Sequence, residues 1–130
     1  MTRPIEMTIR DIDTQAMREW CEILRDDNPI HLDPAKAEAL GFGSRTVNPG
    51  PANLAYLLTL IENAAPGMTP ISLEAAFLGN VMSGDVAVAT GQIDDGKARM
   101  ELRVTSDGAA ERTVLMAEVR LKPIDGTGVD

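Results

Sequence analysis

The sequence is poor in cysteine, histidine and aromatic residues, and each shortage excludes a class of function. Its 130 residues contain one cysteine, one histidine and four aromatic side chains, which are Trp20, Phe42, Tyr56 and Phe77. A lone cysteine cannot form a disulfide framework, and one cysteine with one histidine provides too few ligands for a conventional zinc site. So few aromatic rings cannot form a base-stacking platform for single-stranded nucleic acid. The core must therefore be aliphatic.

Positive charge is also scarce. Twenty acidic residues against twelve basic ones give a net charge of −8 at pH 7, which repels nucleic-acid backbones and anionic membranes. The longest apolar stretch, residues 54–61, is far shorter than the roughly 20 residues that span a bilayer. Residues 1–13 contain no hydrophobic signal core. We therefore expect a cytoplasmic protein that binds neither nucleic acid nor a membrane.

The chain contains enough apolar sequence for one core. A hydrophobic fraction of 44% in 130 residues is typical of one globular domain. We predict a single domain over residues 1–130, with a flexible, glycine-rich tail from about residue 125.

Three helices are predicted in the first half of the chain. A first helix is expected over residues 13–25, because four apolar residues recur there at helical spacing, namely Met17, Trp20, Cys21 and Leu24. Either Asp13 or Thr14 is suited to cap this helix. A second, short helix is expected between Asp33 as its cap and Gly41 as its terminator. The third runs from Pro51 to residue 64 and is apolar around most of its circumference, which is typical of a helix buried in the middle of a fold.

The second half of the chain predicts antiparallel strands. Apolar and polar residues alternate over residues 98–105 and 115–122, the period expected of strands with one solvated face. Asp94-Asp95-Gly96 and Ser106-Asp107-Gly108 supply turns. Further strands are expected near residues 4–10, 71–78 and 85–94. A sheet wrapped on the third helix would bury both, so we predict an α+β fold.

The segment from Asp26 to His31, Asp-Asp-Asn-Pro-Ile-His, is the candidate active site because it contains the only histidine. A carboxylate near an imidazole can orient the ring and hold its proton, as general acid–base catalysis requires. A lone histidine is more often structural, and Asp26, Asp27 and Asn28 could be only solvated or turn residues. Gly50 is a second candidate: it is either a flexible turn residue or an N–H donor at the positive start of the third helix.

Three parts of the chain resemble one known family. Asp26–Pro34 resembles the D-x-N-P-x-H-x-D segment of MaoC-like dehydratases, the family that contains the (R)-specific enoyl-CoA hydratases. Phe77–Asp85 resembles the family's F-x-x-P-V-x-x-G-D segment. Gly41-Phe42, followed by Gly50 and the buried helix, resembles the family's approach to its central helix. Together these matches cover most of residues 13–122.

The resemblance implies a hotdog fold, in which an antiparallel sheet wraps one long helix, usually in homodimers or higher oligomers. It implies reversible hydration of a trans-2-enoyl thioester of CoA, or of acyl-carrier protein, to the (R)-3-hydroxyacyl form, with no metal and no cofactor beyond the thioester itself. Asp26 would act as general base and His31 as its acid–base partner, with the catalytic water between them. Asn28 would orient the pair, and the Gly50 N–H would bind the thioester oxygen.

Two other functions remain open from the sequence. A non-catalytic hotdog subunit would need a catalytic partner, and the complete set of Asp26, Asn28 and His31 disfavours it. An acyl-CoA thioesterase on the same fold would use an acidic residue to activate water against the carbonyl, which the Asn28–His31 segment does not favour.

Overall fold

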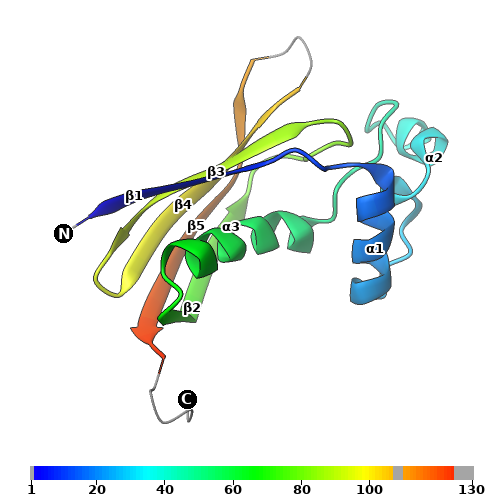
Figure 1. Cartoon of the computed structure of the whole chain (residues 1–130). Helices are drawn as coiled ribbons and strands as arrows, with labels where there is room; N and C mark the ends of the chain where they lie inside the picture. Colours follow the sequence, from blue (N-terminus) through cyan, green and yellow to red (C-terminus); the bar gives the residue numbers. More distant parts are fainter. Residues whose placement is uncertain (1, 107–109, 125–130) are drawn as a thin grey trace.

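The computed structural model describes residues 2–106 and 110–124, and its main feature is one curled antiparallel sheet with a long helix against its inner face (Figure 1). The strands are β1 (Arg3–Ile9), β2 (Met68–Phe77), β3 (Val86–Asp94), β4 (Lys97–Thr105) and β5 (Arg112–Pro123). They form a five-stranded sheet in the order β1-β3-β4-β5-β2. Every neighbouring pair is antiparallel. The predicted α+β arrangement is confirmed.

The helical segments are α1 (Thr14–Leu24), the 3₁₀ helix η1 (Pro29–His31), α2 (Pro34–Ala39) and α3 (Gly50–Ala64). Of the two candidate caps for α1, the structure uses Asp13, and the predicted cap at Asp33 is confirmed. The Asp13 carboxylate accepts a hydrogen bond of 2.7 Å from the Ala16 N–H at the start of α1. The Asp33 carboxylate accepts one of 2.9 Å from the Ala35 N–H at the start of α2. These caps satisfy N–H groups that have no partner within their own helix.

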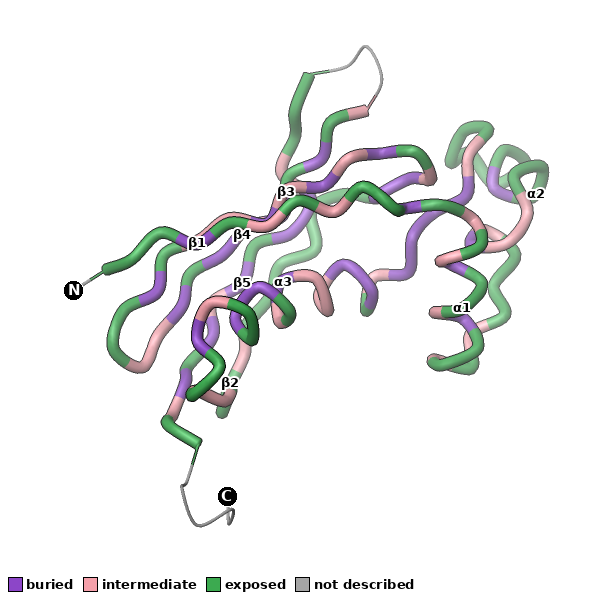
Figure 2. Tube along the Cα trace, viewed as in Figure 1, coloured by how far each residue is buried: buried purple, intermediate pink, exposed green. Residues whose placement is uncertain are grey.

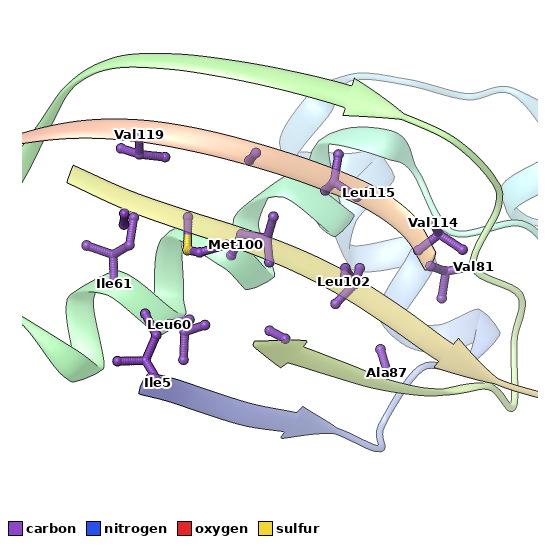
Figure 3. Packing of buried hydrophobic residues seen from close by; sticks show 14 of the residues in the cluster. Ile5, Leu60, Ile61, Val81, Ala87, Met100, Leu102, Val114, Leu115 and Val119 are labelled. Carbon is purple, nitrogen blue, oxygen red and sulfur yellow. The ribbon is translucent and has the colours of Figure 1, made fainter. Parts of the chain in front are cut away.

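The core lies between α3 and the sheet. Figure 3 shows Leu60 and Ile61 of α3 directed toward the strands that carry Met100 and Val119, and all four side chains belong to one buried cluster. Gly91 of β3 is required there, because an added Cβ would lie 2.5 Å from the Arg99 carbonyl oxygen. The absent side chain allows β3 and β4 to approach closely at this point.

One flank of α3 departs from the prediction of burial on all sides. Figure 2 shows a buried face toward the sheet and less buried positions on the opposite side. Leu54, Ala55 and Leu58 are half-buried, and Thr59 and Glu62 are exposed. The helix thus carries more apolar surface than this chain alone covers, a composition typical of a helix that is covered on two sides.

The shorter helices α1 and α2 lie beyond the N-terminal end of α3 (Figure 1). The predicted turn at residues 94–96 joins β3 to β4, with Gly96 at a φ of +73°. The other predicted turn lies outside the described residues except for Ser106, and so does the tail from residue 125. Within the part of the chain that the structure describes, no helix combines the length and the apolar character needed to cross a membrane.

Candidate active site

The end of α1 presents Asp26 to the site. Arg25 ends the helix in the left-handed region, with a φ of 53°, and its N–H donates to the Cys21 carbonyl. The Asp26 N–H donates to the same carbonyl at 3.0 Å. One oxygen of the Asp26 carboxylate then accepts a 3.0 Å hydrogen bond from the Asn28 N–H. The chain therefore turns sharply after α1, and this turn fixes the Asp26 carboxylate in place.

Asn28 acts through both its backbone and its side chain. Its side-chain oxygen accepts a 3.2 Å hydrogen bond from the Ile30 N–H and so caps η1, the short helix that ends at His31. Because its own N–H binds Asp26, Asn28 sits between the two halves of the predicted pair. The contacts provide a physical way for Asn28 to orient both groups.

His31 faces Asp26 with one ring nitrogen and the main chain with the other. Its Nδ1 lies 2.6 Å from the Val47 carbonyl oxygen, and its Nε2 lies 3.4 Å from the second oxygen of the Asp26 carboxylate. His31 is only 7% exposed, whereas the Asp26 side chain is 41% exposed. The imidazole is thus buried beneath the carboxylate, and the carboxylate itself is partly exposed to solvent.

This geometry assigns a proton position. A carbonyl oxygen can only accept, so Nδ1 of His31 must carry a proton, and in the neutral ring Nε2 is then an acceptor. A bare Nε2 facing an ionised Asp26 would place two acceptors 3.4 Å apart. A proton shared between Nε2 and the carboxylate relieves that repulsion, whereas 3.4 Å leaves no room for a water molecule between the two atoms. The pair is consequently able to hold and release one proton, as acid–base catalysis requires.

The segment that carries Val47 is braced by an ion pair between the buried Asp85 and the partly exposed Arg45, which sequence reasoning missed. Asp85 is fully buried. Its carboxylate accepts hydrogen bonds from the Arg45 guanidinium at 2.8 Å, the Ser106 hydroxyl at 2.8 Å and the Met82 N–H at 2.9 Å. Val47 in turn pairs with Met82 as an isolated bridge. The Val47 carbonyl that orients the imidazole is therefore fixed to the sheet through Asp85.

Gly50 is the first residue of α3 and follows Pro49, which provides no side-chain cap. Among the described residues, none accepts a hydrogen bond from the Gly50 N–H, and none links Gly50 directly to Asp26 or His31. The connection runs through the chain, because Gly50 comes three residues after Val47. An added Cβ at Gly50 would lie 3.5 Å from the ring of Phe77. A free N–H at the positive start of a helix is suited to bind a developing negative charge.

A surface cleft of about 400 Å³ gives access to Asp26. Its lining combines basic, acidic and apolar residues from α1 and the following loop, namely Arg18, Cys21, Glu22, Arg25, Asp26, Asp27 and Leu32. Cys21 is buried, and burial raises the pKa of its thiol. No group of three or more His, Cys, Asp or Glu side chains in residues 2–106 and 110–124 is placed to hold a metal ion.

A second set of polar residues near the start of α3 was also missed. Asn48 and Asn53 are each only 3% exposed, and the side chain of Asn48 donates to both Asn53 and Tyr56. A sequence signal existed, because Asn53 interrupts an otherwise apolar helix three residues after Gly50. Asn48 carried no comparable signal, since asparagine before proline is ordinary in a turn.

A curled antiparallel sheet around one long helix defines a hotdog fold, and solved structures confirm this fold. The unliganded R-hydratase PhaJ1 from Pseudomonas aeruginosa is 21% identical with a TM-score of 0.77, covering 95% of this chain and 81% of that one. An (R)-hydratase from A. caviae involved in PHA biosynthesis is 22% identical with a TM-score of 0.77, covering 93% and 94%.

A third similar structure comes from an assembly of different chains. The C-terminally truncated HadBC (3R-hydroxyacyl-ACP dehydratase) complex from Mycobacterium tuberculosis is 17% identical with a TM-score of 0.70, covering 94% of this chain and 95% of that one. No model of a known protein family matches the sequence, and no curated protein is significantly similar to it. Likeness at these identities establishes the fold, so the activity has to be inferred from the site.

Proposed function

We propose that this chain is a hydro-lyase of the MaoC-like dehydratase family that reversibly hydrates a trans-2-enoyl-CoA thioester to the (R)-3-hydroxyacyl-CoA. The observation that carries the proposal is the 3.4 Å approach of His31 Nε2 to the Asp26 carboxylate, with the opposite ring nitrogen held by Val47. The fold shared with two (R)-hydratases and a dehydratase complex supports the same class of reaction. The place of action that we infer is the cytoplasm.

The proposed reaction balances within the protein and its substrate. Asp26 removes a proton from a water molecule, and the hydroxide oxygen forms a bond to C3 of the enoyl group. The electron pair of the double bond moves toward the thioester oxygen, where the Gly50 N–H stabilises the negative charge. Protonated His31 delivers a proton to C2, and Asp26 then returns its new proton to His31. Only the thioester and one water molecule are consumed, and we propose that no metal or separate cofactor takes part.

Each part of the scheme makes a characteristic contribution to the reaction rate. A positioned acid–base pair contributes about 100- to 10,000-fold in rate. An N–H donor aimed at a developing oxyanion contributes about 100- to 1,000-fold. Losing Asp26 or His31 should therefore reduce turnover much more than it changes stability, because neither carries core packing on the sheet.

The test is hydration of a short trans-2-enoyl-CoA, followed as loss of the absorbance of the conjugated double bond. We expect Asp26→Asn and His31→Ala each to lower kcat at least 100-fold, with the melting temperature within a few degrees of the parent. Asp27→Asn is the matched control, because Asp27 is the exposed neighbour of Asp26 and should keep parental turnover. Parental rates in either site variant would contradict the assignment.

The same assay separates the two alternative functions. Release of free CoA thiol without hydration would favour the thioesterase. Activity that appears only when a second, different chain is added would favour a subunit of a heteromeric enzyme, an arrangement supported by the HadBC complex among the similar structures. An acyl-carrier-protein thioester in place of the CoA ester distinguishes the two possible substrate carriers.

We further propose that two copies of this chain form the working unit. The half-buried flank of α3 at Leu54, Ala55 and Leu58 is apolar and faces away from the sheet. Along the edge strand β2 and just after it, Ile71 is 53%, Phe77 55% and Leu78 58% exposed. An edge strand with exposed apolar residues is a surface that proteins ordinarily cover. A second copy would cover both surfaces.

A further inference from the structure

Three polar side chains are grouped at the first turns of α3, in an otherwise apolar part of the molecule. The Asn48 amide Nδ2 donates hydrogen bonds to the Asn53 side-chain oxygen at 2.7 Å and to the Tyr56 hydroxyl at 3.1 Å. Asn48 and Asn53 are each 3% exposed, and Tyr56 is half-buried. We call these three residues, the two asparagines with their amides and the tyrosine that one of them contacts, the amide trio. Aliphatic residues would fill the same space without the cost of removing amides from water.

The amide trio has unused hydrogen-bonding capacity. Neither the Asn48 side-chain oxygen nor the Asn53 Nδ2 has a partner among the described residues. At the same time, no described polar side-chain atom that is cut off from solvent lacks a partner. Both atoms must therefore touch accessible space, although the residues that carry them are almost wholly buried. One is an acceptor and the other a donor.

Tyr56 adds a second donor. Its oxygen accepts from Asn48, which leaves its O–H free to donate. Burial raises the pKa of Tyr56 above its usual value, outweighing the opposite effect of the hydrogen bond from Asn48. The hydroxyl therefore keeps its proton at neutral pH. The free groups of the amide trio, one acceptor and two donors, match a ligand group that both donates and accepts.

The amide trio lies beside the proposed oxyanion donor. Asn53 is three residues after Gly50 and so lies on the same side of the helix, about 4.5 Å further along its axis. Asn48 directly follows Val47, whose carbonyl holds His31. An acyl chain whose thioester oxygen is bound at the Gly50 N–H would reach the amide trio within a few carbon atoms.

We propose that the amide trio binds a hydroxyl group on the acyl chain, so that the site selects hydroxyl-bearing acyl thioesters over plain alkyl thioesters of the same length. This inference rests on the proposed function, because binding of the thioester at Gly50 sets the position of the chain. A hydroxyl can accept from Asn53 and donate to Asn48, whereas an alkyl chain leaves both groups unpaired. Sites built to hydrogen-bond a substrate hydroxyl discriminate strongly against analogues that lack it.

The test measures binding with saturated thioesters, which cannot be hydrated. Calorimetric titration of the full chain compares 5-hydroxypentanoyl-CoA with pentanoyl-CoA. We expect the hydroxyl compound to bind at least tenfold more tightly. Equal affinity, tighter binding of the alkyl compound, or no binding of either at millimolar concentration would overturn the inference. Because no reaction is involved, a tenfold preference in a protein that hydrates nothing would refute the proposed function and leave the binding inference standing.

Two variants connect the preference to the amide trio. Asn53→Leu replaces the free donor by an aliphatic group of similar size, and Tyr56→Phe removes only the hydroxyl. Each should reduce the preference to less than threefold, mainly by weakening the binding of the hydroxyl compound. Asn63→Leu is the matched control on the exposed side of the same helix and should keep the parental ratio. A preference retained in both variants would show that another group binds the hydroxyl and would overturn the assignment.

Discussion

Tyr56 is the only tyrosine of the chain, so its ionisation can be followed without interference. Burial raises its pKa in the folded protein, while in the unfolded chain the phenol titrates near 10. Below about pH 10 both states are protonated, and the stabilising effect of this residue is fully present. As the pH rises from there toward the folded pKa, the unfolded state alone loses its proton and gains in stability.

We therefore predict that the melting temperature falls as the pH increases above about 10. Tyr56→Phe should reduce this fall, because phenylalanine cannot ionise. The measurement is a series of thermal melts between pH 8 and 11, together with phenolate absorbance of the folded protein. A phenolate transition at pH 10 or below in the folded parent would contradict the account.

At the scale of single residues, the sequence was informative where a side chain itself carries the chemistry. His31 was identified because it is the only histidine, and Asp26 because it is a carboxylate close to His31 in a segment that resembles a known family. The structure places the two side chains 3.4 Å apart. The contribution of Val47 could not be identified, since it comes from a backbone carbonyl that any residue would provide. The partners of Asp85 come from distant segments, and no local pattern predicts such contacts.

Among the elements, the contact between β3 and β4 depends on Gly91. Its ideal Cβ would lie 2.5 Å from the Arg99 carbonyl oxygen and 2.7 Å from Met100 Cγ, so a methyl group cannot fit without a shift of the backbone. We predict that Gly91→Ala destabilises the protein by about 1–3 kcal/mol, as expected for overpacking. The midpoint of urea denaturation measures this.

Gly67→Ala is the control for that substitution, because an added Cβ at Gly67 meets nothing within 4 Å. Its free energy of unfolding should stay within about 0.5 kcal/mol of the parent. Equal effects of the two substitutions would show that the close approach at Gly91 does not constrain the sheet.

At the scale of helices and strands, the ends of the elements could be predicted from local sequence signals. The caps at Asp13 and Asp33 and the turn at residues 94–96 were predicted because capping and turn formation involve only neighbouring residues. Period-two alternation likewise located β4 and β5. Which surface covers α3 could not be predicted from the sequence. The apolar composition of a helix indicates how much surface it must bury, but not what packs against it.

For the whole molecule, the uncovered flank of α3 predicts association. Leu58→Glu would place a charge on that flank, where Leu58 is half-buried, and we expect it to convert a dimer into monomers in size-exclusion chromatography with light scattering. The control is Ile23→Glu, because Ile23 is 73% exposed on α1 and lies away from the proposed interface. A monomeric parent chain, or a dimer that survives Leu58→Glu, would contradict the proposed assembly.

The burial of Asp85 has a consequence for how the molecule comes apart. Its one carboxylate contacts side chains from three segments, namely Arg45 in the loop before α3, Ser106 directly after β4 and Arg112 at the start of β5. Opening of the loop before α3 would remove the 2.8 Å contact with Arg45 and leave only Arg112, at 3.6 Å, as a cationic partner of the carboxylate. Loss of the closer partner is unfavourable because the carboxylate is buried. Opening of the loop that positions the imidazole should therefore cost more free energy than opening of a surface loop without such a contact.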